Sequence, residues 1–214
     1  MIAGRALRVA RTSKDSIPEG GCVFRPEQLD SDRAMVLVID LQEKILALVR
    51  ENRSVVSRSR VMLEGARVFG LPVVLTEQYP KGLGSTESSI TEACHAARAE
   101  RFEKPTFSAW AEASIRERLI QLDRPQVIMV GIETHVCVQQ TTLDLRSRDY
   151  DVFVCADAVG ARGRANHEAA LDRMRQAGAF VTTVESVLFE LCGTTEAAPF
   201  KAMLEVIKAN PPKD

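Results

Sequence analysis

The 214-residue sequence lacks several features that characterise large functional classes. It has a formal net charge of −1 and only 5% aromatic residues. It therefore offers neither the basic surface nor the stacking rings that nucleic-acid binding uses. No apolar run approaches the length of a membrane span. We expect neither nucleic acid nor a membrane as a partner.

Metal-binding and disulfide patterns are also missing. The five cysteines form no CxxC pair, and the three histidines, His95, His135 and His167, are scattered. Because a metal site needs clustered ligands, we expect no metal and no other cofactor. No secretory signal is recognised near the N-terminus, so free thiols in a reducing cytoplasm are expected.

Strands and helices are predicted to alternate after residue 33. Residues 35–39 are a continuous apolar run, typical of a strand that is buried on both faces. Further strands are predicted at 72–75, 101–103, 127–130, 151–155 and 179–182. Helices are predicted at 54–69, 90–99, 111–122, from Cys137 onward, and at 167–176, 186–191 and 197–209. This order predicts right-handed crossovers, a parallel sheet and helices on both of its faces.

The predicted domain does not include the ends of the chain. Residues 1–33 are expected to form an N-terminal arm, residues 34–209 the domain, and residues 210–214 a C-terminal tail. The first fourteen residues contain basic side chains and no acidic ones. An extended arm on the surface or on a partner subunit is one interpretation, and a transit peptide is the alternative.

Three reactive side chains follow predicted strand ends, where ligands bind in parallel sheets. Cys137 follows a sharp turn from strand to helix, where free N–H groups and the helix dipole favour a thiolate and can hold an oxyanion. We therefore expect its pKa to be depressed. Asp40 could deprotonate the thiol, and Lys104 could favour the thiolate and orient Asp40. Taken singly, each has an ordinary alternative: a packed cysteine, a capping aspartate and a surface lysine.

The sequence around these residues resembles a known family. The blocks VLVIDLQEKI, EKPTFSAW and GIETHVCVQQTTLDL resemble the signature blocks of the isochorismatase-like cysteine hydrolases. Two further stretches, LTEQYPKGLG and DRMRQAGAF, are similar to the isochorismatase-domain-containing subgroup. The resemblance covers roughly residues 34–209.

The resemblance implies a fold and a site. The fold is a three-layer α/β/α sandwich around a six-stranded parallel sheet, and the chain is expected to form a homo-oligomer, a dimer or a tetramer. The triad is Asp40, Lys104 and Cys137. A cis peptide bond between Ile132 and Glu133 is also implied, and it would direct the Glu133 N–H, beside that of Cys137, at the oxyanion.

Two departures from the family pattern argue against metal-assisted nicotinamide hydrolysis and against vinyl-ether cleavage. Nicotinamidases of the family carry an Asp-and-His metal site near the first block, but no such histidines follow Asp40 here. True isochorismatases lack the cysteine and cleave a vinyl ether by general acid catalysis, which the presence of Cys137 argues against.

Further residues are candidates for contacts with the substrate, although packing is an alternative for several of them. Gln42 could also hold the Asp40 carboxylate or the turn that follows it. The substrate-binding candidates are Gln42, Gln78, Tyr79, Phe107 and Trp110. His135 lies in the turn before Cys137, and a Cys–His dyad remains a rival mechanism.

The sequence therefore predicts a metal-independent cysteine hydrolase of the amidase type (EC 3.5), which cleaves a small amide or related C–N bond through a thioester. A non-catalytic binding or scaffold protein with the same fold is an alternative, as is a family hydrolase that acts on an ester or vinyl ether. The small-molecule substrate itself is not specified, because loops build the pocket walls.

Overall fold

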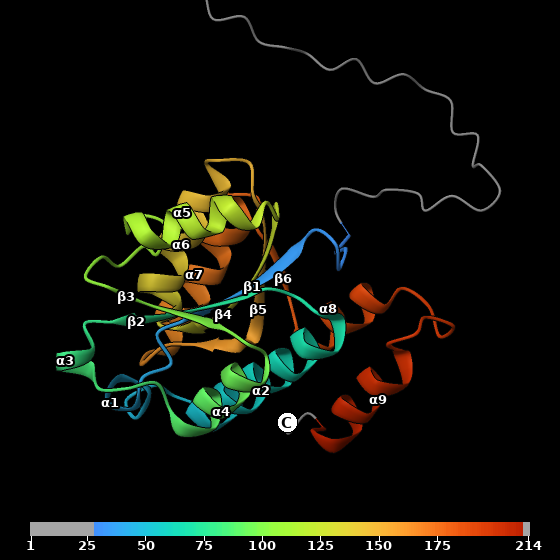
Figure 1. Cartoon of the computed structure of the whole chain (residues 1–214). Helices are drawn as coiled ribbons and strands as arrows, with labels where there is room; N and C mark the ends of the chain where they lie inside the picture. The colour runs from blue at the N-terminus through green and yellow to red at the C-terminus, as the bar shows by residue number, and fades with distance from the viewer. Residues whose placement is uncertain (1–27, 212–214) are drawn as a thin grey trace, which may run out of the picture.

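Six strands form one all-parallel sheet in the order β3-β2-β1-β4-β5-β6 in the computed structural model, which describes residues 28–211 (Figure 1). The strands are β1 (Ala34–Ile39), β2 (Val73–Gln78), β3 (Glu100–Lys104), β4 (Gln126–Ile132), β5 (Asp151–Gly160) and β6 (Phe180–Thr182). The predicted six-stranded parallel sheet is confirmed.

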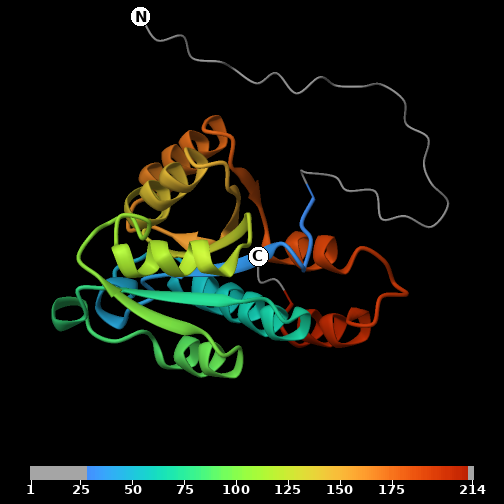
Figure 2. The ribbon, with the colours of Figure 1, turned by 45° about the horizontal axis from the view of Figure 1, so that its top comes forward.

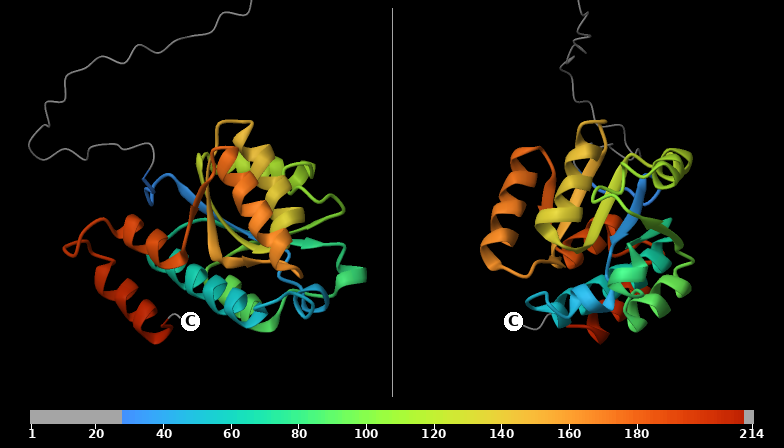
Figure 3. Two further views of the ribbon diagram at one scale, coloured as in Figure 1. Left: turned by 180° about the vertical axis from the view of Figure 1, so that it is seen from behind. Right: turned by 90° about the vertical axis from the view of Figure 1, so that its left-hand side faces the viewer.

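Helices cover both faces of this sheet, as predicted for a three-layer sandwich (Figures 1 and 2). One face carries α2 (Asn52–Phe69), α4 (Ser88–Ala96), α8 (Val184–Cys192) and α9 (Phe200–Ala209). The other carries α5 (Ala113–Leu122), α6 (Gln139–Arg146) and α7 (Arg164–Gln176). Figure 3 shows α9 against α2 and α8. The short elements are α1 (Glu43–Leu46), α3 (Pro80–Leu83) and a π-helical turn, η1 (Thr134–Val138).

The continuous apolar run of β1 reflects burial on both faces. Val36 and Val38 pack into the core under α2, while Met35, Leu37 and Ile39 pack into the core under α5, α6 and α7. Because successive side chains of a strand alternate between faces, a central parallel strand needs apolar residues at every position. The sequence pattern therefore identified the centre of the sheet correctly.

Two strands extend beyond the apolar runs that predicted them. β2 continues through the polar residues Glu77 and Gln78, because the buried Glu77 carboxylate accepts hydrogen bonds from the N–H and hydroxyl of Thr86, at 2.9 and 2.7 Å. β5 continues to Gly160 after an irregularity in its pairing with β4. The extension of β2 is polar, whereas that of β5 is mainly apolar.

The ends of the predicted domain are described only in part. Of the expected N-terminal arm, residues 28–33 lie against the domain: the Asp30 N–H donates to Gln126 Oε1 at 2.8 Å, and Gln126 Nε2 donates to the Gln28 carbonyl at 2.7 Å. The rest of the arm, residues 1–27, and residues 212–214 of the expected tail lie outside the described residues. Within residues 28–211, no helix is long and apolar enough to cross a membrane.

Candidate active site

The carboxyl ends of four neighbouring strands bring the predicted reactive residues together. Asp40 directly follows β1, Gln78 ends β2 and Lys104 ends β3. Cys137 lies in the segment from Ile132, the last residue of β4, to Val138. We call this segment the nucleophile turn, after the role predicted for Cys137. Because β3, β2, β1 and β4 are adjacent in the sheet, the residues at their carboxyl ends lie at the same edge, as the sequence predicted.

A glycine makes the close approach of β4 to β1 possible. Gly131 pairs with Ile39, and a Cβ at this position would lie 2.0 Å from the Ile39 carbonyl oxygen. Its φ of +123° also lies in the region that favours glycine. Asp40 itself adopts a φ of +50°, a left-handed conformation that Asp tolerates better than most residues. The backbone conformations of Gly131 and Asp40 therefore let the ends of β4 and β1 lie close together.

Asp40 and Lys104 form a buried ion pair. Lys104 Nζ lies 2.7 Å from Asp40 Oδ2, and the two residues are 1% and 2% exposed. Thr76, which the sequence analysis did not single out, donates its hydroxyl to Asp40 Oδ1 at 2.7 Å. Burying two charges is costly unless both are paired and hydrogen-bonded, as they are here. The alternatives of a capping aspartate and a surface lysine are therefore wrong.

Three further acceptors fix the Lys104 ammonium. Gln78 Oε1 accepts at 2.7 Å, and the carbonyls of Thr106 and Phe107 accept at 3.1 and 3.2 Å. Gln78 is itself held by a bond from its Nε2 to the Pro105 carbonyl at 2.9 Å. Lys104 thus points from the end of β3 toward Asp40, with its charge satisfied on all sides.

Cys137 lies beside this pair. Its thiol interacts with both the Asp40 carboxylate and the Lys104 ammonium, and its Sγ lies 3.9 Å from Gln78 Oε1. Burial and the negative charge of Asp40 raise the pKa of Cys137 to about 12, although Lys104 acts in the opposite direction. The expected depression of this pKa is therefore wrong. Cys137 is also not the first residue of an α-helix, because η1 precedes α6, and at 6% exposure its desolvation outweighs the helix dipole.

The nucleophile turn begins with a cis peptide bond between Ile132 and Glu133. The Glu133 side chain points away to the loop before α7, where Arg162 donates to its Oε1 from the backbone N–H at 3.1 Å and from Nε at 3.0 Å. His135 lies in the same turn, and its Nδ1 is buried without a hydrogen-bond partner among residues 28–211. The interactions that shift the Cys137 pKa come from Asp40 and Lys104 and not from His135.

The structure separates the predicted substrate-binding residues into two groups. Gln78, Tyr79 and Phe107 adjoin Lys104, and the Tyr79 and Phe107 side chains are 61% and 55% exposed. Gln42 is fully buried and holds backbone groups: its Nε2 donates to the Gln78 and Gly84 carbonyls, and its Oε1 accepts from the Gln78 N–H. Its expected role in substrate binding is wrong, because the side chain is fully buried and holds the loop.

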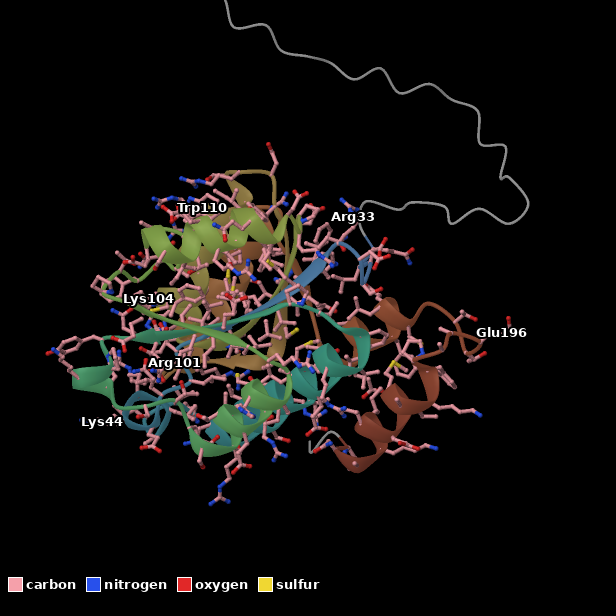
Figure 4. The ribbon with its side chains drawn as sticks, viewed as in Figure 1. Arg33, Lys44, Arg101, Lys104, Trp110 and Glu196 are labelled. Atoms are coloured by element: carbon pink, nitrogen blue, oxygen red, sulfur yellow. The ribbon has the colours of Figure 1, made fainter. Side chains whose placement is uncertain are left out.

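Trp110 also lies apart from the candidate site. Its ring packs edge-on against Tyr150 at 5.6 Å and carries the Arg148 guanidinium 5.1 Å from its centroid. Figure 4 shows it beside α5, away from Lys104 at the end of β3. The core-packing interpretation holds for Trp110, and its expected role as a pocket wall is wrong.

Metal ligands do not gather at this edge. Within residues 28–211, no group of three or more His, Cys, Asp or Glu side chains has the arrangement of a metal site. The chemistry available from the described residues is thus that of a carboxylate, an ammonium and a thiol in contact, next to a backbone turn.

The fold is a parallel α/β/α sandwich, and the Asp40–Lys104 pair lies at the carboxyl edge of its sheet. The isochorismatase domain matches residues 34–186, and the chain belongs to this family. It is 39% identical over 179 residues to isochorismatase domain-containing protein 1 of Salmo salar, which covers 81% of this chain. The matched part spans only 60% of that relative's own length.

Solved structures of similar proteins agree with the fold. A structure described as MAR1 ribonuclease from Caenorhabditis elegans is 35% identical, with a TM-score of 0.82, and covers 87% of this chain and 95% of its own. YcaC from Escherichia coli, described as an octameric hydrolase of unknown specificity, is 28% identical with a TM-score of 0.81 and coverages of 86% and 91%. YcaC from Pseudomonas aeruginosa, described with hexane-2,5-diol and covalent acrylamide, is 29% identical with a TM-score of 0.79 and coverages of 86% and 93%.

Proposed function

We propose that this protein hydrolyses a small amide or related C–N bond through a thioester on Cys137. One observation carries the proposal: the Cys137 thiol contacts a fully buried Asp40–Lys104 ion pair at the carboxyl edge of the sheet. A buried ion pair is weak evidence for stability, because its desolvation cost can exceed its attraction. A carboxylate held dry and charged beside a thiol is, in contrast, what a general base requires.

The first half of the reaction forms the thioester. Asp40 takes the Cys137 proton while Sγ attacks the carbonyl carbon, and the electron pair of the C=O bond moves to oxygen. When the tetrahedral intermediate collapses, the C–N bond breaks and Asp40 passes its proton to the leaving nitrogen. Lys104 keeps the Asp40 carboxylate oriented and balances the negative charge of the site.

The second half regenerates the enzyme. Asp40 deprotonates a water molecule, which attacks the thioester carbon, and the C–S bond breaks. The proton on Asp40 returns to the Cys137 sulfur, and the acid product leaves. In both halves the N–H groups of Glu133 and Cys137 are proposed to hold the oxyanion, while Gln78, Tyr79 and Phe107 contact the substrate.

Similar proteins support parts of this proposal. The acrylamide described as covalent in the Pseudomonas aeruginosa YcaC is consistent with a reactive nucleophile in that relative. The octameric Escherichia coli YcaC supports our inference that this chain also forms a homo-oligomer. A reducing compartment such as the cytoplasm would keep Cys137 free, and this location stays a prediction.

A substrate screen tests the proposal. Small amides, ureides, esters and vinyl ethers, with a short RNA as a separate arm because one relative is described as a ribonuclease, would be offered to wild type, to Cys137→Ser and to the matched control Cys192→Ser. We expect release of an amine from an amide and a trapped acyl group on the Cys137 peptide. Turnover of RNA alone, or turnover that survives in Cys137→Ser, contradicts the proposal, and an absence of any turnover favours a binding or scaffold role.

A further inference from the structure

A second set of contacts joins the nucleophile turn to the start of α7. Thr134 Oγ1 lies 2.9 Å from Nδ1 of His167, which is on the first turn of α7. Glu133 is bonded to Arg162, just before the same helix. The turn is therefore held to the start of α7 at two consecutive residues.

The π-helical geometry couples Thr134 to Cys137. Both residues lie within η1, and the Gln139 N–H closes this turn onto the Thr134 carbonyl. The Thr134 side chain is fully buried, and its hydroxyl has His167 Nδ1 as a hydrogen-bond partner. A displacement of Thr134 would therefore move the Cys137 backbone with it.

We propose that His167 is a positioning residue, which holds Thr134 and thereby fixes Cys137 Sγ and the neighbouring backbone N–H groups relative to the substrate carbonyl. The inference rests on the proposed function, because it assumes that Cys137 is the nucleophile. His167 does not touch the reacting atoms. It acts on their position through Thr134.

The surroundings of His167 show that this role is geometric. Its ring borders a cavity of about 310 Å³ between the start of α2, the end of β5 and the start of α7, with Arg50, Glu51, Asp157 and Arg164 as the charged lining groups. Burial lowers the pKa of His167, against the opposing effect of Glu51 and Glu168. The ring is thus mainly neutral at pH 7, and the Thr134 hydroxyl can donate to or accept from its Nδ1.

Site-specific labelling tests the inference without a known substrate. The rate at which acrylamide labels Cys137 would be followed by mass spectrometry of its peptide at pH 8 in wild type, His167→Leu, His167→Asn and Thr134→Val. We expect His167→Leu and Thr134→Val to slow labelling roughly five- to tenfold, which corresponds to the loss of one hydrogen bond. The double variant should be no slower than either single one. His167→Asn should recover most of the rate, because its amide can occupy the position of Nδ1.

Two internal references separate positioning from loss of the fold. Cys155 is fully buried and should stay unlabelled in every variant that remains folded. Arg164→Gln alters the same helix turn and cavity but removes only an ion pair with Glu168, so its labelling rate should equal that of wild type. Once a substrate is known, His167→Leu should lower kcat and leave KM unchanged.

The possible outcomes distinguish a failure of the positioning role from a failure of the proposed function. Wild-type labelling of Cys137 in His167→Leu overturns the positioning role, as does a slow His167→Asn with Cys155 still protected. A wild-type protein whose Cys137 does not react with acrylamide overturns the proposed function, and the positioning role with it.

Discussion

Asp40→Asn should change two properties of Cys137 in opposite directions. The variant should alkylate faster at neutral pH, yet it should hydrolyse substrate far more slowly. The reason is that the Asp40 charge and its contact with the thiol both raise the pKa of Cys137, whereas the same carboxylate is the proposed base. Asn can accept the Thr76 or Lys104 hydrogen bond and tolerates the left-handed backbone of this position, so we expect the fold to survive.

The magnitude follows from the pKa of the thiol. With a pKa of about 12 instead of its ordinary 9.0, Cys137 is almost entirely protonated at neutral pH, and its thiolate is far rarer than that of an ordinary thiol. The difference corresponds to about 4 kcal/mol. Removing Asp40 withdraws part of this shift and leaves the part caused by burial. Hydrolysis, in contrast, should fall by about 10²- to 10⁴-fold, as is typical for loss of a general base.

Alkylation profiles measure both effects. Iodoacetamide labelling of the Cys137 peptide would be followed from pH 6 to pH 10, beside hydrolysis of a substrate from the screen. The wild-type labelling rate should keep rising through pH 10 without a plateau, and the Asp40→Asn profile should lie at lower pH. Asp149→Asn, a change at an exposed left-handed aspartate, should match wild type. A wild-type plateau below pH 8, or slower labelling and normal hydrolysis in Asp40→Asn, would refute the reasoning.

Four other expectations concern stability, metal dependence and assembly. Lys104→Met should lower the free energy of unfolding by about 3–5 kcal/mol in urea titrations, because it strands a buried carboxylate, while the exposed Lys201→Met should change little. Gly131→Ala should prevent folding or destabilise strongly by circular dichroism, since its Cβ would lie 2.0 Å from the Ile39 carbonyl oxygen. Exhaustive chelation should leave hydrolysis unchanged, and restoration of lost activity by zinc, iron or manganese would contradict this. Light scattering at micromolar concentration should give a mass well above 23.6 kDa, and a monomer would contradict the oligomer.

The placement of the reactive residues could be predicted from the sequence because it depends on strand order alone. Asp40 and Cys137 follow apolar runs, and Lys104 follows the short strand predicted at 101–103. Parallel strands bring such strand ends to one edge of the sheet. The details of contact depend on long-range packing, which no local pattern encodes. The complete burial of Lys104, for example, requires the Thr106 and Phe107 carbonyls to fold back over its ammonium.

The predictions that failed concern properties that depend on the three-dimensional surroundings of a residue. The low pKa expected for Cys137 was based on the helix dipole, which the sequence pattern indicates. It took no account of desolvation, because the sequence does not show how deeply the thiol is buried. Trp110 was a candidate for the pocket wall, with core packing as the alternative, and the loop turns it toward Tyr150. The link between Thr134 and His167 joins residues 33 positions apart, and no sequence signal pointed to it.

A raised thiol pKa requires the base to act during the attack itself. A less acidic thiol gives a more nucleophilic thiolate, with a Brønsted coefficient of about 0.4–0.5 for thiolate attack on disulfides. Because this coefficient is below one, a raised pKa makes the thiolate rarer at neutral pH by a larger factor than it makes it more reactive. A thiolate formed without the help of a base would therefore react more slowly than an ordinary one. Asp40, in contact with the thiol, removes this deficit if it takes the proton as the C–S bond forms. The same arrangement keeps the resting thiol protonated and so resistant to oxidation between turnovers.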